Sequence, residues 1–171
     1  AKCGSATIST MGGAVRNCQS CEAEHHPRTD PAIIVLVKDS KDRILLGRQK
    51  IWPAKRFSTF AGFVEPGESF ESTVIREGHV TEMRYLGSQP WPFPASIMIA
   101  FEATISNPDS VKADGDEIEE IIWLDRSEIK KKVAAEELLL PPSISVARAM
   151  INAWYGPQAK AELVSMETWR N

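Results

Sequence analysis

The chain is 171 residues long and carries 20 basic against 23 acidic side chains, so its formal net charge is −3 at pH 7. That balance argues against binding of nucleic acid through bulk electrostatic attraction, and no apolar run approaches the roughly 18 residues that a membrane-spanning helix needs. No signal peptide is visible, and the length allows one well-buried domain plus a small module. We therefore expect a cytoplasmic globular protein without a membrane partner.

Three cysteines lie near the start of the chain. Cys18 and Cys21 form a C-x2-C pair, and Cys3 precedes Cys18 with 14 residues between them, near the spacing of a zinc ribbon. A fourth cysteine in C-x2-C spacing with Cys3 would stand one position before Ala1. We therefore expect a partial zinc ribbon and linker over residues 1–29, completed upstream. The alternative is three free buried thiols of a reduced cytosolic protein.

Residues 32–63 have the pattern of a β-hairpin followed by another strand. Residues 32–37 form a short continuous apolar run, typical of a strand covered on both faces. The polar segment 39–42 indicates a turn, which makes residues 43–49 the returning strand. Residues 57–63 predict the next strand.

A helix is expected after these strands. Ser69 is a suitable N-cap, and Phe70 with Val74 makes an apolar pair at i, i+4. We expect this helix to end near Glu77.

The second half of the chain predicts further strands and helices. Three apolar stretches predict strands over residues 80–87, 97–105 and 118–124. A charged stretch predicts a helix over residues 126–135. After two prolines, Ser143 is suited to cap another helix, whose apolar stripe comprises Ala147, Met150, Ile151 and Trp154. Helices on a mixed sheet predict an α/β sandwich, with the main domain over residues 30–171.

Four residues around the first helix form the most specific motif of the chain. Gly62, Glu68, Arg76 and Glu77 fit the pattern G-x5-E-x7-R-E. A loop that leads into a helix places such carboxylates where they bind divalent cations, which bridge phosphate oxygens and activate water. The pattern resembles the first two thirds of the Nudix box, which continues with an aliphatic residue and then two adjacent glutamates.

The last third of that box is absent. Where it is expected, the chain reads Gly78-His79-Val80-Thr81-Glu82. The second glutamate would stand one helical turn after Glu77, at Thr81. Glu82 is no substitute, because five steps place it about 140° around the helix from Glu77. Two explanations stay open: a loop is missing from the sequence as given, or the deletion is real.

A run rich in prolines and aromatic rings follows Ser88. Rings held by prolines form a stiff platform suited to stacking on nicotinamide or adenine, although an ordinary buried turn can have the same composition. The run is similar to the segment that marks the NADH pyrophosphatase subfamily of Nudix hydrolases. That resemblance implies that the substrate is bound by Gln89, Pro90, Trp91, Pro92, Phe93, Pro94, Ala95 and Ser96.

The resemblance covers almost the whole chain and implies a fold and a reaction. The fold is a Nudix-type α/β/α sandwich around a mixed sheet, preceded by a small zinc ribbon. The reaction is metal-dependent hydrolysis of the pyrophosphate bond of NADH or NAD to nicotinamide mononucleotide and AMP, and some members also remove NAD caps from RNA. Mg²⁺ or Mn²⁺, structural Zn²⁺ and a homodimer are implied with it. A real deletion in the box would instead favour a non-catalytic dinucleotide-binding protein.

The resemblance also implies roles for single residues. Glu77 and Glu117 would be metal ligands together with the backbone carbonyl of Ala61, whereas Glu68 and Arg76 would support the catalytic motif, with Arg76 pairing a box carboxylate. Without the family context, Glu117 reads as one solvated acid in the run 114–120. The remaining implied residues are Cys3, Cys18 and Cys21 for zinc, and Ala147 and His26 near the substrate.

Overall fold

Strand β4 (Asp30–Lys38) runs through the centre of the molecule, and all its residues from Ala32 to Val37 are buried. The computed structural model describes residues 2–78, 80 and 82–164. Alternate side chains of β4 enter two different hydrophobic cores: Ile34 and Leu36 belong to one, and Ile33, Val35 and Val37 belong to the other. The strand is therefore covered on both faces, as its continuous apolar run predicted.

The main sheet is mixed and has six strands in the order β7-β8-β4-β5-β9, with β6 paired to β4. Its other strands are β5 (Ile44–Gln49), β6 (Phe60–Phe63), β7 (Glu82–Trp91), β8 (Ser96–Thr104) and β9 (Ile118–Leu124). β8 is parallel to β4, and the other pairings are antiparallel. The first half of β4 pairs with β6 and its end pairs with β5, so one edge of β4 serves two strands.

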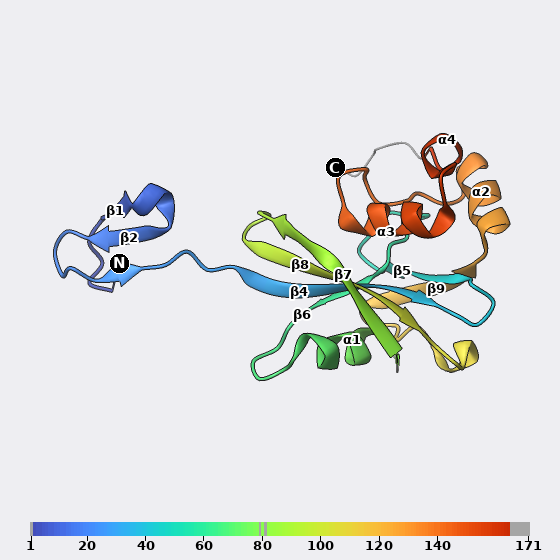
Figure 1. Ribbon diagram of the computed structural model, residues 1–171, viewed down its shortest axis with the longest axis horizontal. Coiled ribbons are helices and arrows are strands. Elements are labelled where there is room, and N and C mark those ends of the chain that lie inside the picture. Colours follow the sequence, from blue (N-terminus) through green and yellow to red (C-terminus); the bar gives the residue numbers. More distant parts are fainter. Residues whose placement is uncertain (1, 79, 81, 165–171) are drawn as a thin grey trace.

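Helices cover both faces of this sheet (Figure 1). Helix α1 (Phe70–Gly78) lies on one face, where Val74 is fully buried in the same core as Val35. On the other face lie α2 (Arg126–Ala134), α3 (Val146–Tyr155) and the short α4 (Ala159–Glu162). The predicted apolar stripe of α3 is buried against the sheet. The predicted α/β sandwich around a mixed sheet is confirmed.

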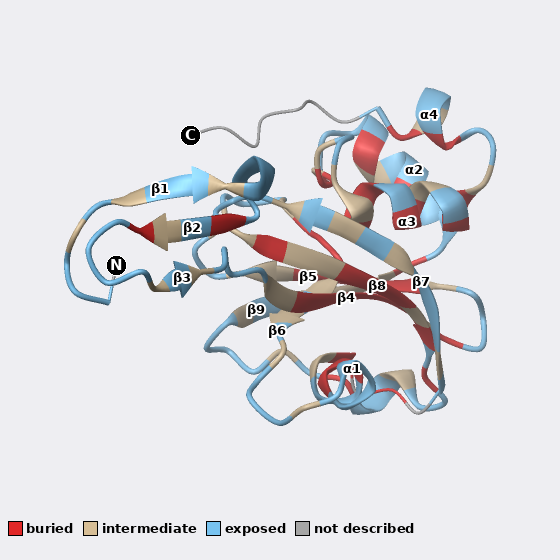
Figure 2. Ribbon diagram, turned by 60° about the vertical axis from the view of Figure 1, so that its left-hand side comes forward, coloured by how far each residue is buried: buried red, intermediate tan, exposed pale blue. Residues whose placement is uncertain are grey.

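A separate three-stranded antiparallel sheet precedes the main sheet. It consists of β1 (Thr7–Thr10), β2 (Val15–Cys18) and β3 (Glu24–His25), with a 3₁₀ turn at Met11–Gly13. Figure 2 shows that buried residues follow β4 and β8 in the main sheet, whereas in the small sheet they are confined to the two ends of β2. The small sheet has little hydrophobic core of its own, so its fold needs stabilisation from another source, such as a bound metal or disulfides. A second 3₁₀ turn, Pro108–Ser110, precedes β9.

Two predicted boundaries are wrong in the second half of the chain. The strand expected to end at residue 87 continues to Trp91, because β7 is an edge strand, where a proline costs no ladder hydrogen bond. The last long helix is capped by Ser145 and not by Ser143: the Ser145 Oγ accepts a hydrogen bond from the Ala147 backbone N–H at 3.1 Å. His79 and Thr81 lie outside the described residues. In the described part of the chain, every helix is too short or too polar to span a bilayer.

Candidate active site

The loop before α1 is held by the carboxylate of Glu68. Its Oε2 accepts hydrogen bonds from the Glu65 backbone N–H at 3.1 Å and from the buried Thr73 hydroxyl at 2.9 Å. The Ser69 Oγ accepts from the Ser72 backbone N–H at 3.1 Å, which satisfies a free donor of the first helical turn. The loop and the helix start are thus one hydrogen-bonded unit.

Arg76 joins this unit to the end of β6. Its guanidinium makes a two-pronged contact with Glu68, Nε to Oε1 at 2.8 Å and one terminal nitrogen to Oε2 at 2.9 Å. It also donates to the Phe63 carbonyl at 3.1 Å and pairs with Glu77. Arg76 therefore makes the pairing with a box carboxylate that the family resemblance implied. This pairing holds the pKa of Glu68 at about 2, below its ordinary value of 4.5.

The Glu68–Arg76 pair predicts a specific pH dependence of stability. Because the pKa of Glu68 is lower in the folded protein than in the unfolded chain, its contribution is present above about pH 4.5 and is lost as the pH falls toward 2. Glu68→Gln should flatten the loss of stability in this window relative to the wild type. Urea unfolding at a series of pH values measures this. An unchanged slope between pH 4.5 and 2 would contradict the assigned role of the pair.

Glu77 occupies space that exists because residue 62 is glycine. A Cβ at Gly62 would lie 2.9 Å from the Glu77 Cγ and closer still to its carboxylate. The Glu77 side chain is only 22% exposed. Burial raises the pKa of Glu77, the nearby Glu117 and Glu68 carboxylates raise it further, and Arg76 partly offsets them. Burial is the largest of these causes, so the raised pKa shows mainly that the Glu77 carboxylate is partly withdrawn from water.

Glu117 is placed by a turn before β9. The Asp114 Oδ1 accepts hydrogen bonds from three consecutive backbone N–H groups, those of residues 116, 117 and 118, at 2.8 to 3.0 Å. These bonds lower the pKa of Asp114. Gln49 on β5 donates from Nε2 to the Glu117 Oε1 at 2.7 Å. Asp114 therefore shapes the turn, and Gln49 fixes the carboxylate.

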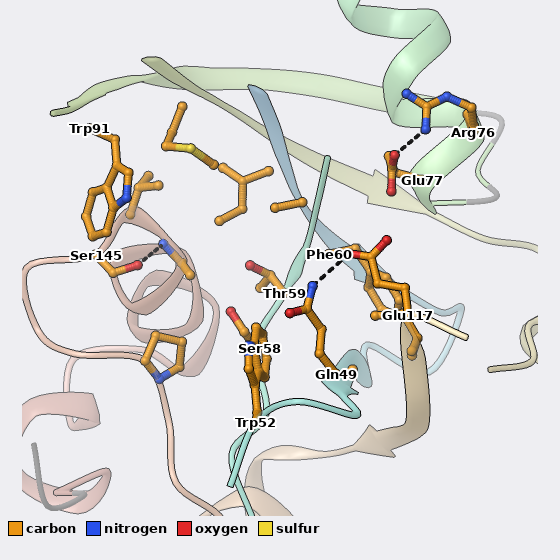
Figure 3. Close-up of a pocket in the computed structure, with 18 of the residues that line it drawn as sticks. Gln49, Trp52, Ser58, Thr59, Phe60, Arg76, Glu77, Trp91, Glu117 and Ser145 are labelled. Carbon is orange, nitrogen blue, oxygen red and sulfur yellow. Dashed lines mark hydrogen bonds and ion pairs between the residues drawn. The ribbon is translucent and has the colours of Figure 1, made fainter. Parts of the chain in front are cut away.

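These groups line one cavity of about 380 Å³, a volume in the range of small-molecule sites. Figure 3 shows its two ends: Arg76, Glu77 and Glu117 lie at one, and Trp91 and Ser145 at the other. Between them the walls are mostly apolar or aromatic. These walls are made by Ile34, Gly47, Trp52, Phe60, Met98, Val111, Ile118, Pro141, Pro142, Val146 and Ala147. The cavity thus joins a charged end to an end suited to an aromatic ring.

The structure brings three of the predicted substrate residues to this cavity: Gln89, Trp91 and Ala147. The Gln89 side chain bridges to the start of α3, donating to the Ile144 carbonyl at 2.8 Å and accepting from the Val146 backbone N–H at 2.9 Å. The other predicted substrate residues do not line the cavity within the described ranges. They are Pro90, Pro92, Phe93, Pro94, Ala95, Ser96 and His26.

The turn after Trp91 supports the aromatic wall from outside. The exposed Phe93 ring packs edge-on against Trp91 with ring centroids 5.4 Å apart, and Ser96 is buried at the start of β8. His26 is exposed in the segment between the two sheets. Phe93 thus acts on the cavity through Trp91 and not by lining it.

Several cavity residues were not singled out from the sequence: Gln49, Trp52, Thr59 and Asp114. Asp114 carries a recognisable signal, since an aspartate two residues before another polar residue and next to Gly115 favours a turn closed by its own side chain. Gln49 and Thr59 carry none: Gln49 occupies an ordinary position at the end of β5, Thr59 lies just before β6, and the neighbours of both depend on how the strands pair.

The charged end has oxygen donors suited to a divalent cation. Glu77, Glu117 and Ala61 all line it, and Mg²⁺ is commonly held by one or two carboxylates with water and substrate phosphate completing its shell. Within the described residues, no three acidic or histidine side chains converge there. The residues present fit a cation held mainly by two carboxylates. The position of the second box glutamate, Thr81, lies outside the described residues.

The three cysteines converge at a second candidate metal site. The sulfurs of Cys3, Cys18 and Cys21 all lie within 4.8 Å of one another, and those of Cys3 and Cys18 are 3.4 Å apart. None is in a disulfide, and only Cys18 is buried. A hydrogen bond with Ser5 is the main cause that lowers the pKa of Cys3 to about 6. Three converging thiols that join the ends of a small sheet fit a soft or borderline metal such as zinc.

Comparisons with known proteins agree with this architecture. A family model described as the NUDIX domain matches residues 28–141. The chain is 48% identical over 146 residues to the NAD-capped RNA hydrolase NudC of Mycobacterium bovis, covering 77% of this chain and 46% of that protein. It is 34% identical over 191 residues to the NAD-capped RNA hydrolase of Schizosaccharomyces pombe, covering 92% of this chain and 51% of that protein.

A solved structure supports the same fold. The crystal structure of a NUDIX hydrolase from Nitrosomonas europaea superposes with a TM-score of 0.51 at 18% identity, covering 75% of this chain and 77% of that one. The chain spans about half the length of the curated relatives it matches. Because 146 aligned positions exceed 77% of 171 residues, the alignment with the M. bovis protein includes positions that have no counterpart in this chain.

Proposed function

The chain belongs to the Nudix family, and from that premise we propose that it hydrolyses the pyrophosphate bond of NADH or NAD. The products of this reaction are nicotinamide mononucleotide and AMP. We propose that the same reaction removes NAD caps from RNA. One observation carries the proposal: a single cavity joins the carboxylates of Glu77 and Glu117 to the Trp91 ring. A dinucleotide has the matching order, with phosphates followed by a nucleoside. The names of the M. bovis and S. pombe relatives support the choice of substrate class.

Each residue has a defined task in this proposal. Glu77 and Glu117 would hold Mg²⁺ or Mn²⁺ with the Ala61 carbonyl, and a bound divalent ion supplies charge neutralisation at the phosphates and a more acidic water. Arg76 and Glu68 keep α1 aligned with β6, so that Glu77 stays beside Gly62. Trp91 offers a ring face to a base, and Ala147 lines the same cavity. Water attacks phosphorus, and the nucleoside monophosphate leaves.

A non-catalytic dinucleotide-binding protein is the second candidate. It is favoured by the early end of α1 at Gly78, which leaves the box with Glu77 as its last glutamate on the helix. The cavity itself is compatible with binding alone, since its apolar walls do not depend on a cation.

Product analysis separates the two candidates. We expect the protein, incubated with NADH and Mg²⁺ or Mn²⁺, to release AMP and nicotinamide mononucleotide in equal amounts, and capped RNA to lose its nicotinamide nucleotide. Release of free nicotinamide would indicate a different bond cleavage. No turnover of any dinucleotide with either metal, together with measurable binding of NADH, would favour the binding protein.

The cysteine cluster leads to a prediction about metal content. We expect one zinc per chain held by Cys3, Cys18 and Cys21 with a fourth ligand, because their sulfurs already converge. Cys18→Ser should abolish the zinc content, since Cys18 is the buried member of the cluster. Ser20→Ala, in the same turn, should leave it intact. Elemental analysis of both variants measures this, and a wild-type protein without zinc would overturn the assignment.

We propose a homodimer from the family resemblance and a cytoplasmic location from the composition of the chain. Sedimentation of the purified protein and microscopy of a tagged form would test these two proposals.

A further inference from the structure

Thr59 contributes a buried polar group to the wall of the cavity. It lies just before β6 and is only 5% exposed. Its hydroxyl is buried and has no hydrogen-bond partner in the described part of the chain. A buried hydroxyl without a partner is unfavourable, so native proteins rarely keep one without a reason.

Three other polar side chains along this cavity already have hydrogen-bond partners. Gln49 donates to Glu117, Gln89 bridges to the backbone at Ile144 and Val146, and the Ser145 hydroxyl accepts from the Ala147 N–H. Thr59 lines the same cavity, so its hydroxyl is an uncommitted donor and acceptor among apolar walls. A valine would fill the same volume without the unpaired hydroxyl.

The position of Thr59 indicates which part of a ligand it meets. Figure 3 shows it midway along the cavity, between the end that carries Glu77 and Glu117 and the end that carries Trp91, with its hydroxyl oxygen on the Trp91 side. In a nucleotide, the ribose lies between the phosphate and the base. A phosphate at the carboxylate end and a base against Trp91 therefore bring the ribose hydroxyls to Thr59.

We infer that the Thr59 hydroxyl is a specificity-determining group that hydrogen-bonds a ribose hydroxyl of the bound nucleotide. The inference rests on the proposed function and names a contact for its substrate. Because the hydroxyl makes no hydrogen bond within the described residues, its removal costs the free protein no hydrogen bond, whereas the complex loses one. Loss of a contact shared by the ground state and the transition state raises KM and leaves kcat nearly unchanged.

The test compares Thr59→Val with Thr59→Ser, which keeps the hydroxyl. Isothermal titration without metal, using AMP and nicotinamide mononucleotide as probes, avoids any dependence on turnover. For the probe that the wild type binds more tightly, Thr59→Val should raise the dissociation constant by about three- to tenfold, and Thr59→Ser should stay near the wild type. Thr104→Val, at an exposed site on β8, is the matched control.

Two further measurements decide what Thr59 contacts. The 2′-deoxy or the 3′-deoxy form of the same nucleotide should bind wild type and Thr59→Val equally well. A loss that persists with both deoxy forms would place the contact on the base and overturn the ribose assignment. The midpoint of thermal unfolding of Thr59→Val should not fall; a lower midpoint would mean a structural role.

Failure of this inference differs from failure of the proposed function. Equal dissociation constants for wild type and Thr59→Val overturn the inference, even if NADH is cleaved. Absence of NADH cleavage with an intact Thr59 effect on nucleotide binding removes the hydrolase and leaves the ribose contact standing.

Discussion

Replacing Glu77 by glutamine should reduce the rate of NADH cleavage by about 100-fold or more while the protein stays folded. Glutamine keeps the size of the side chain but removes the charge that holds a divalent cation, whose electrostatic contribution of several kcal/mol corresponds to at least two factors of ten. The fold should survive because Arg76 keeps its two-pronged contact with Glu68. Steady-state kinetics at saturating metal, with circular dichroism for the fold, measure both effects.

The matched control for this variant is Glu71→Gln. Glu71 lies on the same helix, is exposed and does not line the cavity in the described structure, so its activity should equal that of the wild type. Stability gives a second readout: the pKa of Glu77 is raised in the folded protein, so its ionised form costs stability at pH 7, and Glu77→Gln should not unfold more easily. Unchanged cleavage by Glu77→Gln would exclude the proposed mechanism.

Gly62→Ala should reduce cleavage nearly as much, although alanine adds only a methyl group. The new Cβ would lie 2.9 Å from the Glu77 Cγ and would overlap the carboxylate, so Glu77 must leave its place beside Arg76. A displacement of about 1 Å can cost on the order of 100-fold in rate. Kinetics should show a lower kcat, and the apparent affinity for Mn²⁺ should fall with it.

Gly78→Ala is the corresponding control. A Cβ there would make ordinary contacts of 3.4 to 3.5 Å with Val35, Val37 and Val80. Its activity should be close to that of the wild type, and its helix should gain slightly in stability. If both glycine variants lost activity equally, the effect of Gly62→Ala could not be assigned to the displaced Glu77.

The main sheet was predictable because its signals are local. The apolar run 32–37, the polar turn before residue 43 and the β9 segment 118–124 each carry their pattern within a few residues, and the structure places strands there. Only short-range chemistry was needed for these strand predictions. The contact of Arg76 with a box carboxylate, which the family resemblance implied, is present as well.

The errors arose where distant contacts decide between local options. Ser143 and Ser145 are equally suited to cap a helix by residue type, and the choice depends on Gln89, which binds the backbone at Ile144 and Val146 from 55 and 57 positions away. The roles of Gln49 and Thr59 depend in the same way on which strands become neighbours. Asp114 was not singled out from the sequence, although its hydrogen bonds are local and its turn could have been predicted from neighbouring residues.

The bridge from Gln89 to the start of α3 bears on how the cavity selects among substrates. The amide of Gln89 already holds one backbone acceptor and one backbone donor, so a substrate that competed for it would have to loosen the helix start that carries Ala147. The position of Ala147 relative to β7, the strand that carries Trp91, is therefore set before any ligand arrives. Because the Gln89 amide is already occupied, it is not free to read the nitrogen and oxygen atoms of a bound ring, which would suit the proposed reaction on a nucleotide that is either free or at the end of an RNA.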